Sequence, residues 1–128
     1  MNTAFPQFTN LRPHRNTFAD ILVRHVRERR GGNAPAVYNA AWIDRRTWSA
    51  IISDPGRPVA KRTALQFALA LRLSRPEVDE LLLAAGYALS PVIPEDAIFA
   101  FCIGNGICDL FKVNDILCEN GLKIIPPK

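Results

Sequence analysis

The chain has 128 residues, of which 48% are hydrophobic and 22% charged, so it is long enough for one packed domain and too apolar to be wholly disordered. Its net charge of +4 is unevenly distributed: residues 1–62 carry eleven basic and four acidic side chains, a net charge of +7, whereas residues 63–128 carry five and eight, a net charge of −3. A basic first half predicts contact with a polyanion and a different task for the second half.

Several classes of protein are disfavoured by what the sequence lacks. The N-terminus has no basic start followed by an apolar run, and no apolar stretch approaches the ~20 residues of a membrane span, so we expect a cytoplasmic protein without a membrane partner. Cys102, Cys108 and Cys118 fit no common zinc spacing and are interpreted as reduced, partly buried side chains. Without a Ser/His/Asp set or a phosphate-binding glycine loop, we predict no enzyme, no catalytic residue, no metal site and no cofactor.

The first elements in the chain are an arm and a helix. Residues 1–16 are polar and contain two prolines, which predicts a flexible arm. A helix is predicted over Phe18–Arg30, with Thr17 as its N-cap and Gly31-Gly32 as its end. Its apolar face recurs at three- and four-residue spacing and consists of Phe18, Ile21, Leu22 and Val26.

Two short helices joined by a tight turn come next. Asn33 caps a predicted helix over Pro35–Ala41, which buries Val37, Ala40 and Ala41. The turn Trp42-Ile43-Asp44 leads into a second helix, Arg45–Ser53, capped by Asp44. Its apolar face contains Trp48, Ile51 and Ile52, and its opposite face contains Arg45, Arg46, Ser49 and Ala50.

Two more helices complete the first two thirds of the chain. After Asp54-Pro55-Gly56, a helix over Val59–Leu71 presents an apolar stripe of Ala64, Leu65, Ala68, Leu69 and Leu71. Lys61 and Arg62 lie in its first turn, against the helix dipole, where a bound phosphate would make them favourable. Ser74 and Glu77 form a capping box that opens a helix to Ala85, with Val78, Leu81 and Leu82 buried.

Two helices are predicted in the last third of the chain. After an extended connection over Tyr87–Pro94, they cover Glu95–Ile103, with Ile98, Phe101 and Cys102 on one face, and Ile107–Asn120. The Asn-Gly pair between them is also a hairpin signal, but its flanks do not alternate apolar and polar residues, which favours helices. The acidic residues here are interpreted as a solvated face rather than a metal site: Asp96, Asp109, Asp115 and Glu119.

The order of a short helix, an arginine-led helix, Asp54-Pro55-Gly56-Arg57-Pro58 and a helix closed by Leu71-Arg72-Leu73-Ser74 resembles the phage-repressor-like (Xre-type, lambda-repressor-like) helix-turn-helix family. The similarity covers Phe18–Gly86. It implies an all-α fold: a five-helix lambda-repressor-like helix-turn-helix domain over residues 17–86, with two additional C-terminal helices in an extension over residues 87–128. The chain departs from the family by lacking a glutamine near Pro35, which would brace the DNA backbone, and a glycine in the turn.

Seven residues are candidates for DNA contact. Arg45 and Arg46 are predicted to read bases, because arginine pairs with guanine through two hydrogen bonds. Thr47 and Ser49 are candidates for phosphate or base contacts. The remaining three are predicted to neutralise phosphates without reading sequence, and are Arg57, Lys61 and Arg62. The alternative for each is an ordinary solvated side chain, and for Tyr38 both DNA contact and inward packing remain open.

The first functional hypothesis is a sequence-specific double-stranded-DNA-binding transcriptional regulator, a homodimer on a palindromic site, with Arg45–Ser53 as the recognition helix in the major groove. The C-terminal helices would then supply dimerisation or contact a protein partner. The alternative hypothesis is a helical protein-interaction module, such as an antitoxin, adaptor or inhibitor, built on a helix-turn-helix frame.

Overall fold

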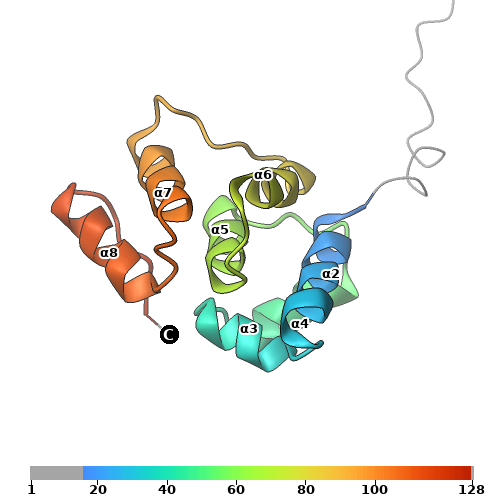
Figure 1. Ribbon diagram of the computed structural model, residues 1–128. Coiled ribbons are helices and arrows are strands. Elements are labelled where there is room, and N and C mark those ends of the chain that lie inside the picture. The colour runs from blue at the N-terminus through green and yellow to red at the C-terminus, as the bar shows by residue number, and fades with distance from the viewer. Residues whose placement is uncertain (1–15, 128) are drawn as a thin grey trace, which may run out of the picture.

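The computed structural model describes residues 16–127, and every regular element within them is an α-helix (Figure 1). The predicted all-α class is therefore confirmed for this part of the chain. Apart from Asn16, the arm predicted at the N-terminus lies outside the described residues. In chain order the helices are α2 (Phe18–Arg30), α3 (Ala34–Ala40), α4 (Arg45–Ser53), α5 (Lys61–Ala70), α6 (Arg75–Ala84), α7 (Pro94–Gly104) and α8 (Leu110–Glu119).

Side-chain caps that the sequence predicted explain where four of these helices begin. The Thr17 hydroxyl accepts a hydrogen bond from the Asp20 amide while the Asp20 carboxylate accepts one from the Thr17 amide, both at 3.1 Å. Ser74 and Glu77 form the same capping box at the start of α6. Asn33 and Asp44 cap α3 and α4. The predicted starts of these four helices are thus confirmed to within one residue.

Two turns have the same construction and the same unusual backbone. Trp42, between α3 and α4, has a φ of 59°, and Arg72, between α5 and α6, has a φ of 55°. In each turn the next residue donates its backbone N–H to a carbonyl five residues earlier, as in a Schellman ending: Ile43 to Tyr38 at 2.9 Å and Leu73 to Ala68 at 3.1 Å. Both turns therefore take the left-handed conformation without the glycine that usually adopts it.

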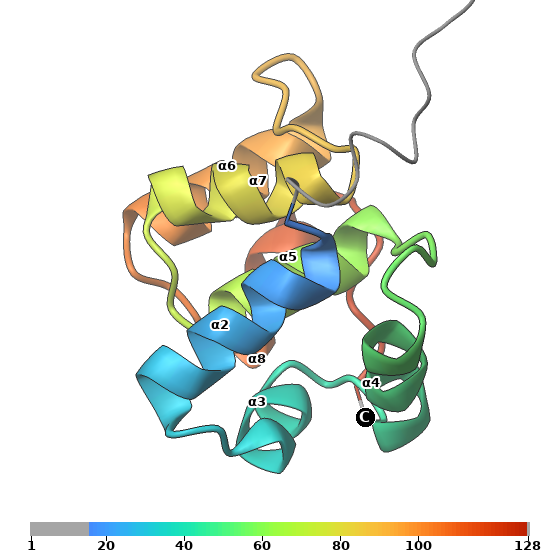
Figure 2. The ribbon, with the colours of Figure 1, turned by 90° about the vertical axis from the view of Figure 1, so that its right-hand side faces the viewer.

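The core is built around α5, in which every residue from 64 to 70 is buried. Figure 2 shows α5 behind α2 and below α6, so that it is covered from several sides. The predicted apolar faces of α2, α5 and α6 are all buried. In α3, however, Val37 and Ala41 are buried but Ala40 is exposed, so the prediction for Ala40 is wrong. The helix ends one turn after Val37 and turns Ala40 outward.

The predicted face of α7 is confirmed at Cys102 and wrong at Phe101. Phe99 and Cys102 are fully buried, whereas Phe101 is 54% exposed and Ile98 is partly buried. The helix is apolar at most positions, so periodicity alone did not select a face. The interpretation of Asp96 as part of a solvated face is wrong: Asp96 lies three residues before Phe99 on the buried side of α7, where it forms an ion pair with Lys61 of α5.

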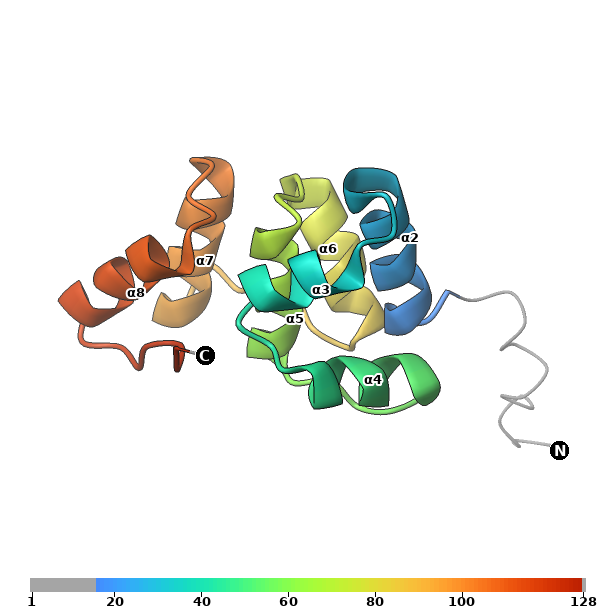
Figure 3. The same cartoon turned by 90° about the horizontal axis from the view of Figure 1, so that it is seen from below.

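Helices α7 and α8 stand beside α5 on the side away from α2 (Figures 1 and 3). Helix α8 begins at Leu110 rather than at Ile107, because the Asp109 carboxylate accepts a hydrogen bond from the Phe111 amide and caps it there. The segment after α8 returns to the core, where Asn114 exchanges two hydrogen bonds with the Ile125 backbone at 2.7 and 2.8 Å. Helices α2 to α6 and the later part of the chain, from α7 to Ile125, thus contribute to one core.

Other sequence expectations concern membranes and metals. Within residues 16–127, no helix combines the length and apolar character that crossing a bilayer requires. Nor do three or more His, Cys, Asp or Glu side chains gather in this part of the chain into a group that would hold a metal ion. The three cysteines are free thiols, with Cys102 buried, Cys108 partly buried and Cys118 exposed.

Candidate nucleic-acid interface

The turn before α4 fixes where the helix starts. The buried Gln66 side chain of α5 donates a hydrogen bond to the Ala41 carbonyl at 2.8 Å, which secures the end of α3. Trp42 then reverses the chain in the left-handed conformation, and the Asp44 carboxylate accepts a hydrogen bond from the Thr47 amide at 2.6 Å. The chain therefore enters α4 through a short connection held at both ends.

One side of α4 packs against the protein. Ile51 is buried, and the Trp48 ring lies between Tyr38 and Phe67, with ring centroids 6.0 and 5.9 Å away. Tyr38, whose orientation the sequence left open, thus packs on the Trp48 ring, and both side chains are partly buried against the core. Figure 3 shows α4 along one margin of the helical bundle. The helix is thus anchored on one side and accessible on the other.

The accessible side of α4 carries most of the predicted contact residues. Arg45, Arg46, Thr47 and Ser49 are all exposed. At about 100° per residue, Arg45, Arg46 and Ser49 point to one side of the helix, whereas Thr47 points toward the flank of Ile51. Ser53 extends the Arg45–Ser49 line by one turn and is also exposed. Sequence reasoning missed Ser53, although its four-residue spacing from Ser49 was the available signal.

Three arginines around α4 have no side-chain partner in the described part of the chain. Arg45, Arg46 and Arg57 form no ion pair or side-chain hydrogen bond among residues 16–127. Arg57 lies in the exposed loop after α4, where its backbone N–H closes a turn onto the Asp54 carbonyl at 3.0 Å. Their guanidinium groups therefore remain available to an external anion.

Lys61 and Arg62 are placed differently. The Lys61 ammonium lies 2.7 Å from the Asp96 carboxylate. Arg62 makes two hydrogen bonds to the Glu95 carboxylate, at 2.7 and 3.1 Å, and a third to the Lys123 carbonyl. The negative partner that the sequence suggested for these cations was a phosphate, whereas the structure supplies two carboxylates from the first turn of α7. DNA contact by either cation would require these ion pairs to open.

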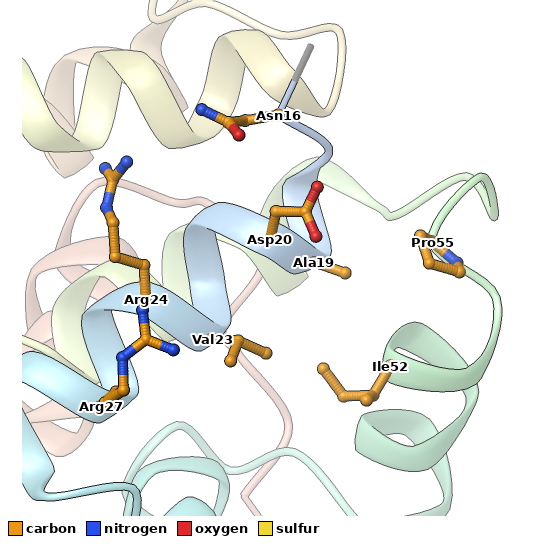
Figure 4. Close-up of a pocket in the computed structure, with 8 residues that line it drawn as sticks. All are labelled: Asn16, Ala19, Asp20, Val23, Arg24, Arg27, Ile52 and Pro55. Atoms are coloured by element: carbon orange, nitrogen blue, oxygen red, sulfur yellow. The ribbon is translucent and has the colours of Figure 1, made fainter. Parts of the chain in front are cut away.

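A groove of about 400 Å³ separates α4 from α2 (Figure 4). Ile52 faces Val23 and Ala19 across it. Arg24 turns toward α6, where it donates to Glu80 at 2.9 Å, but Arg27 has no ion pair among the described residues. Sequence reasoning read Arg27 only as a match to the α2 dipole, and missed that the fold places this free cation beside α4.

Titratable groups with shifted pKa values lie outside this interface. Burial lowers the pKa of His25, which is on α2 and has no hydrogen-bond partner for either ring nitrogen among the described residues. The backbone N–H of Ser74 lowers the pKa of Glu77, and burial raises the pKa of Cys102. Burial and helix capping are structural causes, so these shifts do not identify a catalytic group.

Comparison with known proteins yields no relative: no family model, no curated protein and no solved structure matches this chain. The resemblance to the phage-repressor-like family therefore stays a prediction. What the chain does must be argued from α4 and the residues around it.

Proposed function

We propose that this protein is a sequence-specific double-stranded-DNA-binding transcriptional regulator, acting in the cytoplasm, with α4 as the helix that enters the major groove. One observation carries the proposal. Trp48 and Ile51 anchor α4 from one side, while Arg45 and Arg46 extend from the other and pair with no side chain among residues 16–127. A helix about 10–12 Å wide fits a major groove of about 12 Å.

The surrounding residues suggest a division of roles. Arg45 and Arg46 are suited to the paired acceptors of guanine, and the small Ser49 allows the helix to approach the bases closely. Arg57, in the loop after α4, and Arg27, in the groove between α4 and α2, are suited to phosphates, which confer affinity without sequence choice. Thr47, at the margin of the exposed face, is better placed for a phosphate than for a base.

The turn between α3 and α4 also supports a helix-turn-helix. Members of the phage-repressor-like family often place a glycine in this connection, and the sequence here has none. Trp42 nevertheless adopts the left-handed backbone that glycine would take, with a φ of 59°. The short connection between the two helices is therefore achieved by a different residue.

The decisive experiment selects bound sequences from a pool of random double-stranded DNA, then measures affinity for a selected and a scrambled site at several salt concentrations. We expect Arg46→Ala to reduce the preference for the selected site by about tenfold. Arg57→Ala should weaken both sites equally and lower the salt slope by about one. Arg75→Ala, on an exposed arginine of α6, is the matched control and should change neither. Absence of binding at low salt would refute the proposal.

The alternative, a protein-interaction module, draws support from exposed apolar side chains in the second half of the chain. Leu83 on α6 is 74% exposed and Val92, before α7, is 85% exposed. Exposed apolar side chains mark a protein contact where they join into one contiguous patch, and such a patch would suit a protein partner or a second copy of the chain in the proposed homodimer. A stoichiometric protein partner combined with no DNA binding would favour this module, and light scattering would measure the homodimer.

A further inference from the structure

We propose that α7 and α8 form a brace that fixes the orientation of α4, and that Phe111 is the positioning residue through which the brace acts. Its consequence for DNA recognition rests on the function proposed above. The brace itself involves only contacts within the protein, and it can be tested without DNA.

The first part of the brace is a contact at the turn that enters α4. Trp42 lies three residues before Arg45 and has a left-handed backbone. This conformation is unfavourable for most residues other than glycine. Its ring meets the ring of Phe111, on α8, at a centroid distance of 4.8 Å and an angle of 70°. This edge-to-face geometry is one that aromatic pairs prefer. The contact therefore supports an otherwise unfavourable turn conformation.

The second part of the brace holds the element that follows α4. Helix α5 begins after Ala60 without a side-chain cap, and its first turn contains Lys61 and Arg62. Glu95 and Asp96, from the first turn of α7, form ion pairs with these two cations. The α7–α8 pair thus contacts the chain both before and after α4, so a change in its position would be transmitted to both ends of that helix.

Phe111 offers a clean test because most of its side chain is exposed. It is 64% exposed, and its Trp42 contact is a specific one at the molecular surface. Phe101 on α7 is a matched control: it is 54% exposed and makes no ring contact within the described part of the chain. Removing either ring therefore deletes similar exposed apolar surface, but only one removal affects the turn.

The experiment compares Phe111→Ala, Phe101→Ala and the conservative Phe111→Tyr in the full chain. Without DNA, amide hydrogen exchange of α4 is measured, and we expect about two- to tenfold faster exchange in Phe111→Ala only. With DNA, the ratio of affinities for the selected and scrambled sites should fall by a similar factor in Phe111→Ala. Phe111→Tyr should restore both values, because its ring keeps the edge-to-face contact while its hydroxyl reaches solvent.

Each outcome supports or overturns either the brace or its role in DNA recognition. Equal exchange in the two alanine variants overturns the brace, whatever DNA does. Faster exchange with an unchanged affinity ratio overturns the role of the brace in recognition. If the wild-type protein binds no DNA, the proposed function fails, but the exchange experiment still supports or overturns the brace. Should Phe111→Ala fail to fold, Phe111→Leu replaces it, since leucine keeps apolar bulk and removes the ring.

Discussion

Lys61 is in the first turn of α5, where a positive charge faces the positive end of the helix dipole. The residue that compensates for this placement is Asp96, whose side chain is only 3% exposed and which also accepts a hydrogen bond from the Ser90 amide at 2.8 Å. The two ionic partners are 35 positions apart in the sequence. Local spacing identified the unfavourable cation, but it carries no information about a partner that only the tertiary fold brings near.

Replacing Lys61 with methionine should destabilise the protein through Asp96. The variant leaves a buried carboxylate with the Ser90 N–H but without its cation, and the expected loss in unfolding free energy is about 2–3 kcal/mol, at the low end because Lys61 is itself partly exposed. Urea denaturation measures this loss. The double variant Lys61→Met/Asp96→Asn should recover part of it, because no charge remains buried. A single variant as stable as the wild type would show that the pair contributes nothing.

The turns after α3 and α5 show which features of a single element can be predicted from the sequence. Asp44 and Ser74 were recognisable as caps because their side chains accept hydrogen bonds within their own helix. The left-handed backbone of Trp42 and Arg72 could not be recognised from the sequence, because neither residue type favours that conformation. The buried face of α7 was likewise hidden, since its run of apolar residues fits several faces. Capping is local chemistry, whereas these two features depend on what packs nearby.

Arg72→Gly should stabilise the turn between α5 and α6. Arg72 is exposed and holds a φ of 55°, so glycine relieves the backbone without removing a packed side chain. Part of that gain is offset by the greater freedom of glycine in the unfolded chain, which leaves about 0.5–1 kcal/mol. Chemical denaturation should show this increase for Arg72→Gly and none for Arg72→Ala, which retains the strain. An equal effect of the two substitutions would contradict the backbone explanation.

At the scale of the whole molecule, two described segments share one core: the first is the predicted helix-turn-helix domain, residues 17–86, and the second is the extension after it, residues 87–127. Phe99, Cys102, Leu117 and Ile125 from the second segment are fully buried, as is Leu65 from the first. The family resemblance suggested an appended extension, and the charge patterning suggested a different task for the second half of the chain. The sequence does not show that the two segments are buried in the same core, because this depends on which helix faces pack together in the fold. A brace for α4 requires this shared core, because an extension that opened independently would hold nothing in place.

Cys102 provides a direct test of that requirement. Its thiol is fully buried and its pKa is raised by burial, so a thiol reagent can modify it only after α7 separates from the core. In a Cys108→Ser/Cys118→Ser background, we expect labelling of Cys102 to rise at the same urea concentration at which tryptophan fluorescence is lost. Trp48 lies against Tyr38 and Phe67 of the first segment, whereas Trp42 contacts Phe111 of the second, so a single fluorescence transition that coincides with labelling indicates one cooperative unit. Labelling at lower urea would show that the extension opens first, and it would remove the physical basis of the brace.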